Sequence, residues 1–264
     1  MTEPALDSGF VRIETREHVF RITLDRVDKC NALTRAMYID LGRALDYVVE
    51  TDEIRVVLID SNGPMFCAGN DIADFVDRAS DSSGAGVAGP ALSFIHRMAA
   101  CDKPIVVAVQ GQATGIGLTL LLHADLVVAA DDSRFYTAFI DLGLVPEAGS
   151  SRLLPALIGR QNTARLLLAG DRLNADEALA MGLIAYRVPG AELGEYAHDL
   201  ARRLASKPPG AMRATKQLLR DGIDAETTDQ QIKREAELFE QRLDSPEVRQ
   251  IMHAFLDRHP RKST

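Results

Sequence analysis

Apolar and polar residues follow two different periods along the chain, and the periods predict both strands and helices. Residues 10–24 (FVRIETREHVFRITL) alternate around a polar centre, which predicts an antiparallel hairpin. Helical spacing follows Asn31 and Thr34, both plausible N-caps. Alternation of strands and helices predicts a parallel sheet. Three segments are continuously apolar and β-branched, as strands covered on both faces are: residues 54–60, 104–111 and 125–130.

Strand signals fade after about residue 150, and helical periodicity takes over. Gly170, Gly182 and Gly210 stand where helices are expected to stop. Residues 77–90 are rich in Ser, Gly and Asp, which predicts a mobile loop. We therefore expect an α/β core over residues 1–200 and a helical C-terminal region over residues 201–264.

Composition excludes several classes of function. The 264 residues carry a net charge of −8, which disfavours nonspecific nucleic-acid binding. No apolar run reaches the roughly 18 residues of a membrane span, and no secretory signal opens the chain, so we expect no membrane association. Cys30, Cys67 and Cys101 form no C-x-x-C motif, which favours reduced thiols and a cytoplasmic protein. The six histidines have no metal-ligand spacing, and we predict no metal.

Two glycine-containing loops each follow a predicted strand and open a predicted helix. They are residues 64–75 (PMFCAGNDIADF) and residues 111–125 (GQATGIGLTLLLHAD). Backbone N–H groups at a helix N-terminus are unpaired and lie at the positive end of the dipole, so such loops suit an oxyanion. Taken alone, each loop is better explained by a tight turn in which glycine supplies unusual backbone angles. The second loop lacks the spacing of dinucleotide and P-loop motifs.

A third segment, residues 143–151 (GLVPEAGSS), places Glu147 between Pro146 and a run of small residues, with apolar segments on both sides. A carboxylate in apolar surroundings is costly without a partner, so Glu147 is a candidate catalytic acid or base. The alternative is a first-turn acid stabilised by the dipole of the helix expected at Ser150.

These segments, together with DKPIVVAVQG, DRVDKCNALT and LLLAGDRLNADEALAMGLI, resemble the crotonase superfamily, also called the enoyl-CoA hydratase/isomerase family. The resemblance extends from about Phe10 to Arg258. It implies a ClpP/crotonase-type α/β fold of stacked ββα units with a helical C-terminal trimerisation region. It also implies a homotrimer or dimer of trimers that acts on an acyl-CoA, with coenzyme A part of the substrate and no separate cofactor.

The same resemblance assigns roles to particular residues. The amides of Asn70 and Ile116 are expected to form an oxyanion hole for a thioester oxygen that becomes an enolate. Removing one such donor typically costs around 10²–10³ in rate. Basic residues in the stretch from 26 to 33 would place cations beside the phosphates. The residues expected to bind coenzyme A are Arg26, Lys29, Ala68, Asn70 and Ile72.

Hydratases of the family use two glutamates, and the matching positions here are Thr119 and Phe139, neither of which is a proton acceptor. Isomerases of the family use a single acid, which matches Glu147. The resemblance therefore implies a Δ3–Δ2 enoyl-CoA isomerase of fatty-acid oxidation, in which Glu147 takes a proton from C2 and returns it at C4. Asp71 and Asp74 both fit a capping or solvent-facing role, and Asp74 is the second-choice acid.

Other functions remain open at this point. One is an isomerase of a ring-epoxidised aromatic acyl-CoA, and another is a hydratase with an unconventional acid. A non-catalytic member that binds acyl-CoA or RNA belongs to a different class, and the low basicity disfavours RNA.

Lys216 is expected to be a solvated helix residue.

Overall fold

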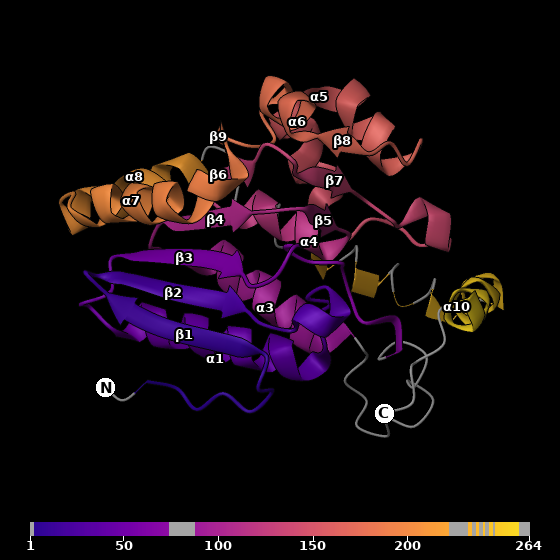
Figure 1. Cartoon of the computed structure of the whole chain (residues 1–264), viewed down its shortest axis with the longest axis horizontal. Coiled ribbons are helices and arrows are strands. Elements are labelled where there is room, and N and C mark those ends of the chain that lie inside the picture. Colours follow the sequence, from indigo (N-terminus) through magenta and orange to yellow (C-terminus); the bar gives the residue numbers. More distant parts are fainter. Residues whose placement is uncertain are drawn as a thin grey trace.

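A six-stranded sheet forms the centre of the molecule (Figure 1). The computed structural model describes residues 3–73, 88–221 and 246–258, with a few more between 232 and 244. The strands lie in the order β1-β2-β3-β4-β6-β9. The first pair is antiparallel and every later pair is parallel, so the predicted hairpin and parallel strands are confirmed. The bounds are β1 Val11–Arg16, β2 Val19–Leu24, β3 Val56–Ser61, β4 Ile105–Val109, β6 Leu126–Ala130 and β9 Tyr186–Val188.

Helices cover both faces of this sheet, which explains the uninterrupted apolar strands. Figure 1 shows α1 (Arg35–Glu50) and α3 (Ala88–Ala100) on one side, and α7 (Leu193–Ala205) on the other. In β3, Val57 and Ile59 belong to the core cluster with α1 and α3. The alternate residues Val56 and Leu58 pack in a second cluster with α7.

A smaller sheet, which the sequence pattern does not predict, continues from the large one. It contains β5 (Gln112–Thr114), β7 (Arg134–Tyr136) and β8 (Leu173–Asn174). The expectation that strands end near residue 150 is thus wrong for β8 and β9. Strands of two or three residues are too short to show a periodic pattern.

The C-terminal part is largely helical, as predicted. Gly170 and Gly182 take positive φ angles of 68° and 82° just after helices, which confirms them as stops. Gly210 is instead the second residue of α8, because Pro209 occupies the first helical position, where proline is favoured. In the described residues of this part, the helices besides α7 are α5 Ser150–Leu167, α6 Ala175–Met181, α8 Pro209–Asp221 and α10 Pro246–Arg258.

The end of the chain contributes to the core. Val248 and Met252 of α10 are buried in the main cluster. Residues 77–87 of the predicted mobile loop, and the catalytic alternative Asp74, lie outside the described residues. Within the described ranges, no helix has the length and apolar character to cross a membrane. The same ranges contain no cluster of three or more metal-ligating side chains.

Candidate active site

The loop after β3 is held as an extra extended segment between two neighbours. On one side, Leu33 donates to the Gly69 carbonyl at 2.8 Å and accepts from the Asp71 N–H at 2.9 Å. On the other side, Cys67 pairs with residues of β5. Alternate residues of a strand face the same neighbour, so the N–H of Asn70 points away from Leu33. Among the backbone hydrogen bonds between described residues, none is donated by this N–H.

The second loop leads from β5 into a short helix, α4 (Ile116–Thr119). Gly115 has φ 54° and ψ −119°, a conformation that strongly favours glycine. Ile116 is the first residue of the helix, where the backbone N–H has no intrahelical partner. No backbone oxygen of the described part of the chain accepts from it.

The two loops are in direct contact. A Cβ atom on Gly117 would lie 2.8 Å from the Cβ and the carbonyl oxygen of Cys67, so only glycine fits this approach. A Cβ on Gly115 would lie 4.0 Å from the Cα of Gly69. The structure therefore brings the predicted donors, Asn70 and Ile116, to neighbouring positions at the carboxyl end of the parallel strands.

Glu147 lies in a tight turn at the start of α5. The turn has two successive residues with positive φ, Ala148 at 55° and Gly149 at 71°. Ser150 donates to the Glu147 carbonyl through its N–H, at 3.0 Å, and through its hydroxyl, at 2.6 Å. The Nε2 atom of His123 lies 2.8 Å from the Ala148 carbonyl oxygen. The backbone that follows the catalytic candidate is thus held at two successive carbonyl groups, those of Glu147 and Ala148.

The side chain of Glu147 is close enough to the first loop to act electrostatically on Cys67. Its Oε1 atom is buried. Burial, and to a smaller extent the negative charge of Glu147, raises the pKa of the Cys67 thiol to about 12. Cys67 is next to Ala68 and Gly69 in the loop, so Glu147, Asn70 and Ile116 are brought into one region. Cys67 itself is a fully buried, protonated thiol.

The two positions that carry acids in hydratases contain no carboxylate. Thr119 is completely buried on α4, and its Oγ1 has no hydrogen-bond partner among the described residues. Phe139 is 5% exposed and packs in the main core. The region around Glu147 therefore lacks a second acid at either of these places.

The residues predicted to bind coenzyme A lie on two adjacent segments. The Ala68 N–H donates to the Cys30 carbonyl at 3.0 Å, which joins residues 26–33 to the loop. The Arg26 guanidinium pairs with Asp71 at 2.8 Å. Lys29 is exposed, and Ile72 is partly buried. Their role in binding stays a prediction, although the segments are adjacent as it requires. Asp71 also accepts from the Ala73 N–H at 3.0 Å, which confirms its capping role.

Sequence reasoning missed three contacts of this region. His123 and Ser150 hold the Glu147 turn, and the Tyr38 hydroxyl donates to Oδ1 of Asn70. The signal for His123 is a single polar residue that ends the apolar run LTLLLH. Ser150 and Tyr38 give no comparable signal.

Lys216 corrects a sequence prediction, because it is buried rather than solvated. It is 6% exposed, and its ammonium donates to Asp125 at 2.7 Å and to the Lys103 carbonyl at 2.8 Å. A lysine is buried in this way only when it is paired.

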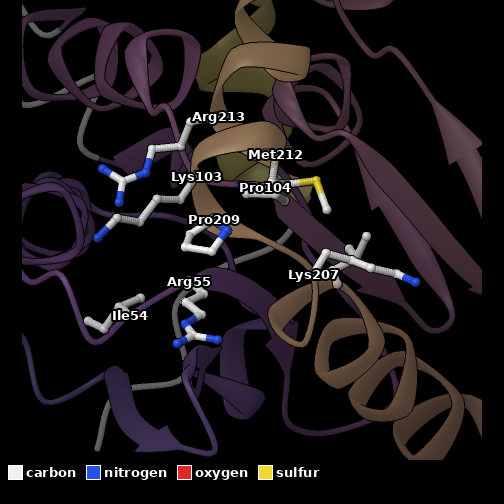
Figure 2. A pocket seen from close by; sticks show the side chains of 9 residues that line it. Ile54, Arg55, Lys103, Pro104, Lys207, Pro209, Met212 and Arg213 are labelled. Atoms are coloured by element: carbon white, nitrogen blue, oxygen red, sulfur yellow. The ribbon is translucent and has the colours of Figure 1, made fainter.

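A small hollow beside Lys103 lies at the amino ends of β3 and β4, opposite the carboxyl ends from which the candidate-site loops begin. Its volume is about 10 Å³, room for about one water molecule. In Figure 2 the side chains of Lys103 and Arg213 extend away from that of Lys207. The Lys103 ammonium donates to the Thr51 carbonyl at 2.6 Å, at the end of α1. This hollow is a structural feature of the helix–sheet junction.

Comparisons with known proteins agree with this architecture. Residues 14–263 match the family described as enoyl-CoA hydratase/isomerase. A solved enoyl-CoA hydratase/isomerase from Pseudoalteromonas atlantica T6c has a TM-score of 0.89 at 37% identity, covering 94% of this chain and 97% of that one. The chain therefore belongs to the enoyl-CoA hydratase/isomerase family, and the expected crotonase fold is confirmed.

Several curated relatives are isomerases by name. The 1,2-epoxyphenylacetyl-CoA isomerase of Escherichia coli (strain K12) is 33% identical over 250 residues, which cover 94% of this chain and 95% of the relative. Enoyl-CoA delta isomerase 2 of Rattus norvegicus is 33% identical over 218 residues, which cover 82% of this chain and 56% of that longer protein. The chain is thus similar to enzymes that act on different acyl-CoA substrates.

Proposed function

We propose that this protein is a Δ3–Δ2 enoyl-CoA isomerase of lipid metabolism that uses Glu147 as its only catalytic acid–base group. The observation that supports this proposal most directly is the buried carboxylate oxygen of Glu147 beside the loop of Cys67 and Asn70. An isomerisation of this type changes neither the oxidation state nor the composition of the substrate. One carboxylate is therefore sufficient, provided that it reaches both C2 and C4.

The chemistry follows from the two halves of the site. The thioester oxygen accepts hydrogen bonds from the N–H groups of Asn70 and Ile116. Glu147 takes a proton from C2 of the 3-enoyl-CoA, and the electron pair moves into a dienolate whose negative oxygen those donors stabilise. The protonated Glu147 then delivers the same proton to C4, and the double bond lies between C2 and C3. The carboxylate is regenerated for the next turnover.

Hydration of a 2-enoyl-CoA is less well supported. Water addition by the usual route in this family needs two acids, and the corresponding positions are the buried Thr119 and Phe139. Keeping water away from a dienolate also protects it from side reactions. The lack of carboxylates at these positions thus favours proton transfer over hydration.

A second candidate is isomerisation of a ring-epoxidised aromatic acyl-CoA. It is supported by the 33% identity to 1,2-epoxyphenylacetyl-CoA isomerase over nearly the whole of both chains. This reaction shares the thioester but differs in the group that Glu147 faces. The two candidates therefore differ in the acyl pocket.

A substrate panel tests these proposals. The wild-type protein and the variants Glu147→Gln and Glu195→Gln are assayed with 3-enoyl-CoA, 2-enoyl-CoA and 1,2-epoxyphenylacetyl-CoA. Glu195 is an exposed control on α7. We expect Glu147→Gln to lower 3-enoyl-CoA isomerisation by roughly 10²–10⁴-fold, as removal of a general base does, while acyl-CoA still binds. Full isomerase activity in Glu147→Gln, or hydration as the faster wild-type reaction, contradicts the proposal.

We also propose assembly into a homotrimer or a dimer of trimers, in a cytoplasmic, reducing setting. Support for assembly comes from apolar side chains left exposed in the single chain: Leu168 at 73%, Leu218 at 71% and Leu219 at 66%. The three cysteines are free thiols, in line with a reducing compartment. Sedimentation equilibrium gives the subunit number, and a monomer at micromolar concentration contradicts the proposed assembly.

A further inference from the structure

The turn that contains Glu147 has a backbone conformation that is unfavourable in free energy unless other contacts stabilise it. Ala148 has φ 55°, where the Cβ of an L-residue approaches the following carbonyl oxygen. Strained conformations of this kind persist only when the surrounding structure over-determines them, and they concentrate at functional sites. The contacts that hold this turn are therefore of interest.

One of these contacts comes from a different element of the fold. Ser150 lies within the turn itself and binds the Glu147 carbonyl. His123 instead belongs to η3 (Leu120–His123), and its Nε2 lies 2.8 Å from the Ala148 carbonyl oxygen. A carbonyl oxygen only accepts, so Nε2 carries the hydrogen and donates it.

The element that carries His123 connects the turn to the oxyanion side. η3 directly continues α4, whose first residue is Ile116. One uninterrupted helical segment thus places the Ile116 N–H at its start and the His123 ring at its end. The hydrogen bond from His123 to Ala148 therefore fixes the Glu147 turn relative to Ile116.

The ring is set in surroundings that keep it neutral. Burial lowers the pKa of His123 to about 4, and its hydrogen bond to Ala148 only partly opposes this shift. The charged or titratable neighbours are His96 on α3 and Lys216 on α8, and both lower the pKa of His123 further. A neutral ring that donates through Nε2 is the state that holds the turn at neutral pH.

We propose that His123 is a positioning residue for the Glu147 base: its Nε2–H holds the Ala148 carbonyl and so keeps the strained turn in register with the Ile116 amide. The inference rests on the proposed role of Glu147 as the base. His123 itself touches no substrate atom in this scheme.

Two substitutions with a matched control test the proposal. His123→Leu removes the donor, and His123→Gln keeps an N–H donor on a side chain of similar reach. His198→Leu, on the partly exposed face of α7, is the control. Misplacing a catalytic group by about 1 Å can cost 10²-fold in rate. We therefore expect His123→Leu to lower kcat by about 10–100-fold with KM nearly unchanged, His123→Gln to recover a large part, and His198→Leu to match wild type.

A double-mutant cycle separates positioning from simple loss of stability. Ala148→Gly removes the Cβ that strains the turn, so the turn depends less on His123. We expect the kcat loss of His123→Leu to be smaller in the Ala148→Gly background. Equal losses in the two backgrounds, or a His123→Leu protein that only melts earlier while the folded enzyme keeps its kcat, overturn the proposal.

A readout without turnover keeps this inference separate from the proposed reaction. Hydrogen exchange at the Ser150 amide, which closes the turn, should be faster in His123→Leu and unchanged in His198→Leu. If the wild type turns out not to isomerise 3-enoyl-CoA, only the proposed function fails. Unchanged exchange at Ser150 in His123→Leu overturns the positioning role whatever the reaction.

Discussion

The two halves of the candidate site are held by different means. The loop with Asn70 is fixed by main-chain hydrogen bonds to Leu33 on one side and to β5 on the other. The turn with Glu147 combines one main-chain bond, from the Ser150 N–H, with side-chain donors from His123 and Ser150. The half with Asn70 thus resembles a small piece of sheet. The half with Glu147 is a strained turn that depends on hydrogen-bond donors from neighbouring side chains.

This difference determines which substitutions each half tolerates. Main-chain pairing does not depend on the side chains that are present, so in the first half only the glycines that permit close approach are restricted. In the second half particular donors are needed. Oxyanion geometry should therefore be robust to most substitutions and to pH, whereas the base should be sensitive to both.

The largest effect is expected from Gly117→Ala, which breaks the main-chain half. The new Cβ would lie 2.8 Å from atoms of Cys67, so one of the two loops must move. Displacing an oxyanion donor costs roughly 10²–10³ in kcat. Gly194→Ala on α7 is the control, because nothing lies within 4 Å of the added Cβ. Steady-state kinetics on both variants decide the matter, and a Gly117→Ala enzyme within threefold of wild type refutes this account.

Lowering the pH should destabilise the half of the site that contains Glu147, because His123 becomes protonated on unfolding. We expect this effect to be smaller than that of Gly117→Ala. The folded-state pKa of His123 is about 4, below its ordinary value of 6.5, so the unfolded chain binds more protons between these values. Stability from this group is complete above pH 6.5 and is lost as the pH falls toward 4. The loss is at most about 3 kcal/mol in the free energy of unfolding.

Denaturant unfolding at pH 7, 6, 5 and 4 measures this loss. The His123→Gln protein lacks the titrating ring, so the difference between the two curves isolates the histidine from the carboxylates. We expect the curves to diverge below pH 6.5. Parallel curves over that range show that the histidine is not the titrating group.

The same division explains what the sequence predicts and what it misses. The strands at 54–60 and 104–111 were predictable because both of their faces are covered, which leaves a continuous apolar run. β5 and β9 have three residues each, too few for a pattern. The longer strands could therefore be predicted from the sequence, and the shortest ones could not.

For the site, residues on glycine loops were predictable and their supports were not. Asn70, Ile116 and Glu147 lie in local motifs of unusual composition. His123 gains its role from a contact with Ala148, 25 positions further on. Lys216 was predicted wrongly for the same reason, since its partner Asp125 is 91 positions away. Such contacts depend on tertiary packing, which local periodicity does not encode.

The smallest effect is expected from replacing two buried threonines, one in each half of the site, by valine. Thr137 lies on the segment that leads to Glu147, and its hydroxyl donates to the Leu166 carbonyl at 2.6 Å. Thr119 lies on α4, and its hydroxyl has no partner among the described residues. Thr137→Val leaves a buried carbonyl with one bond fewer and should cost about 1 kcal/mol or somewhat more. Thr119→Val should leave the unfolding free energy unchanged or slightly raised, because it removes an unsatisfied hydroxyl.

Urea unfolding of the two valine variants measures this contrast, and the wild-type m-value is the check that unfolding stays two-state. A larger cost for Thr119→Val than for Thr137→Val would mean that the oxyanion half also relies on a side chain. The division into a main-chain half and a side-chain half would then be wrong at α4. The expected order leaves the Ile116 amide supported by backbone alone, whereas the position of Glu147 depends on donors that a single substitution removes.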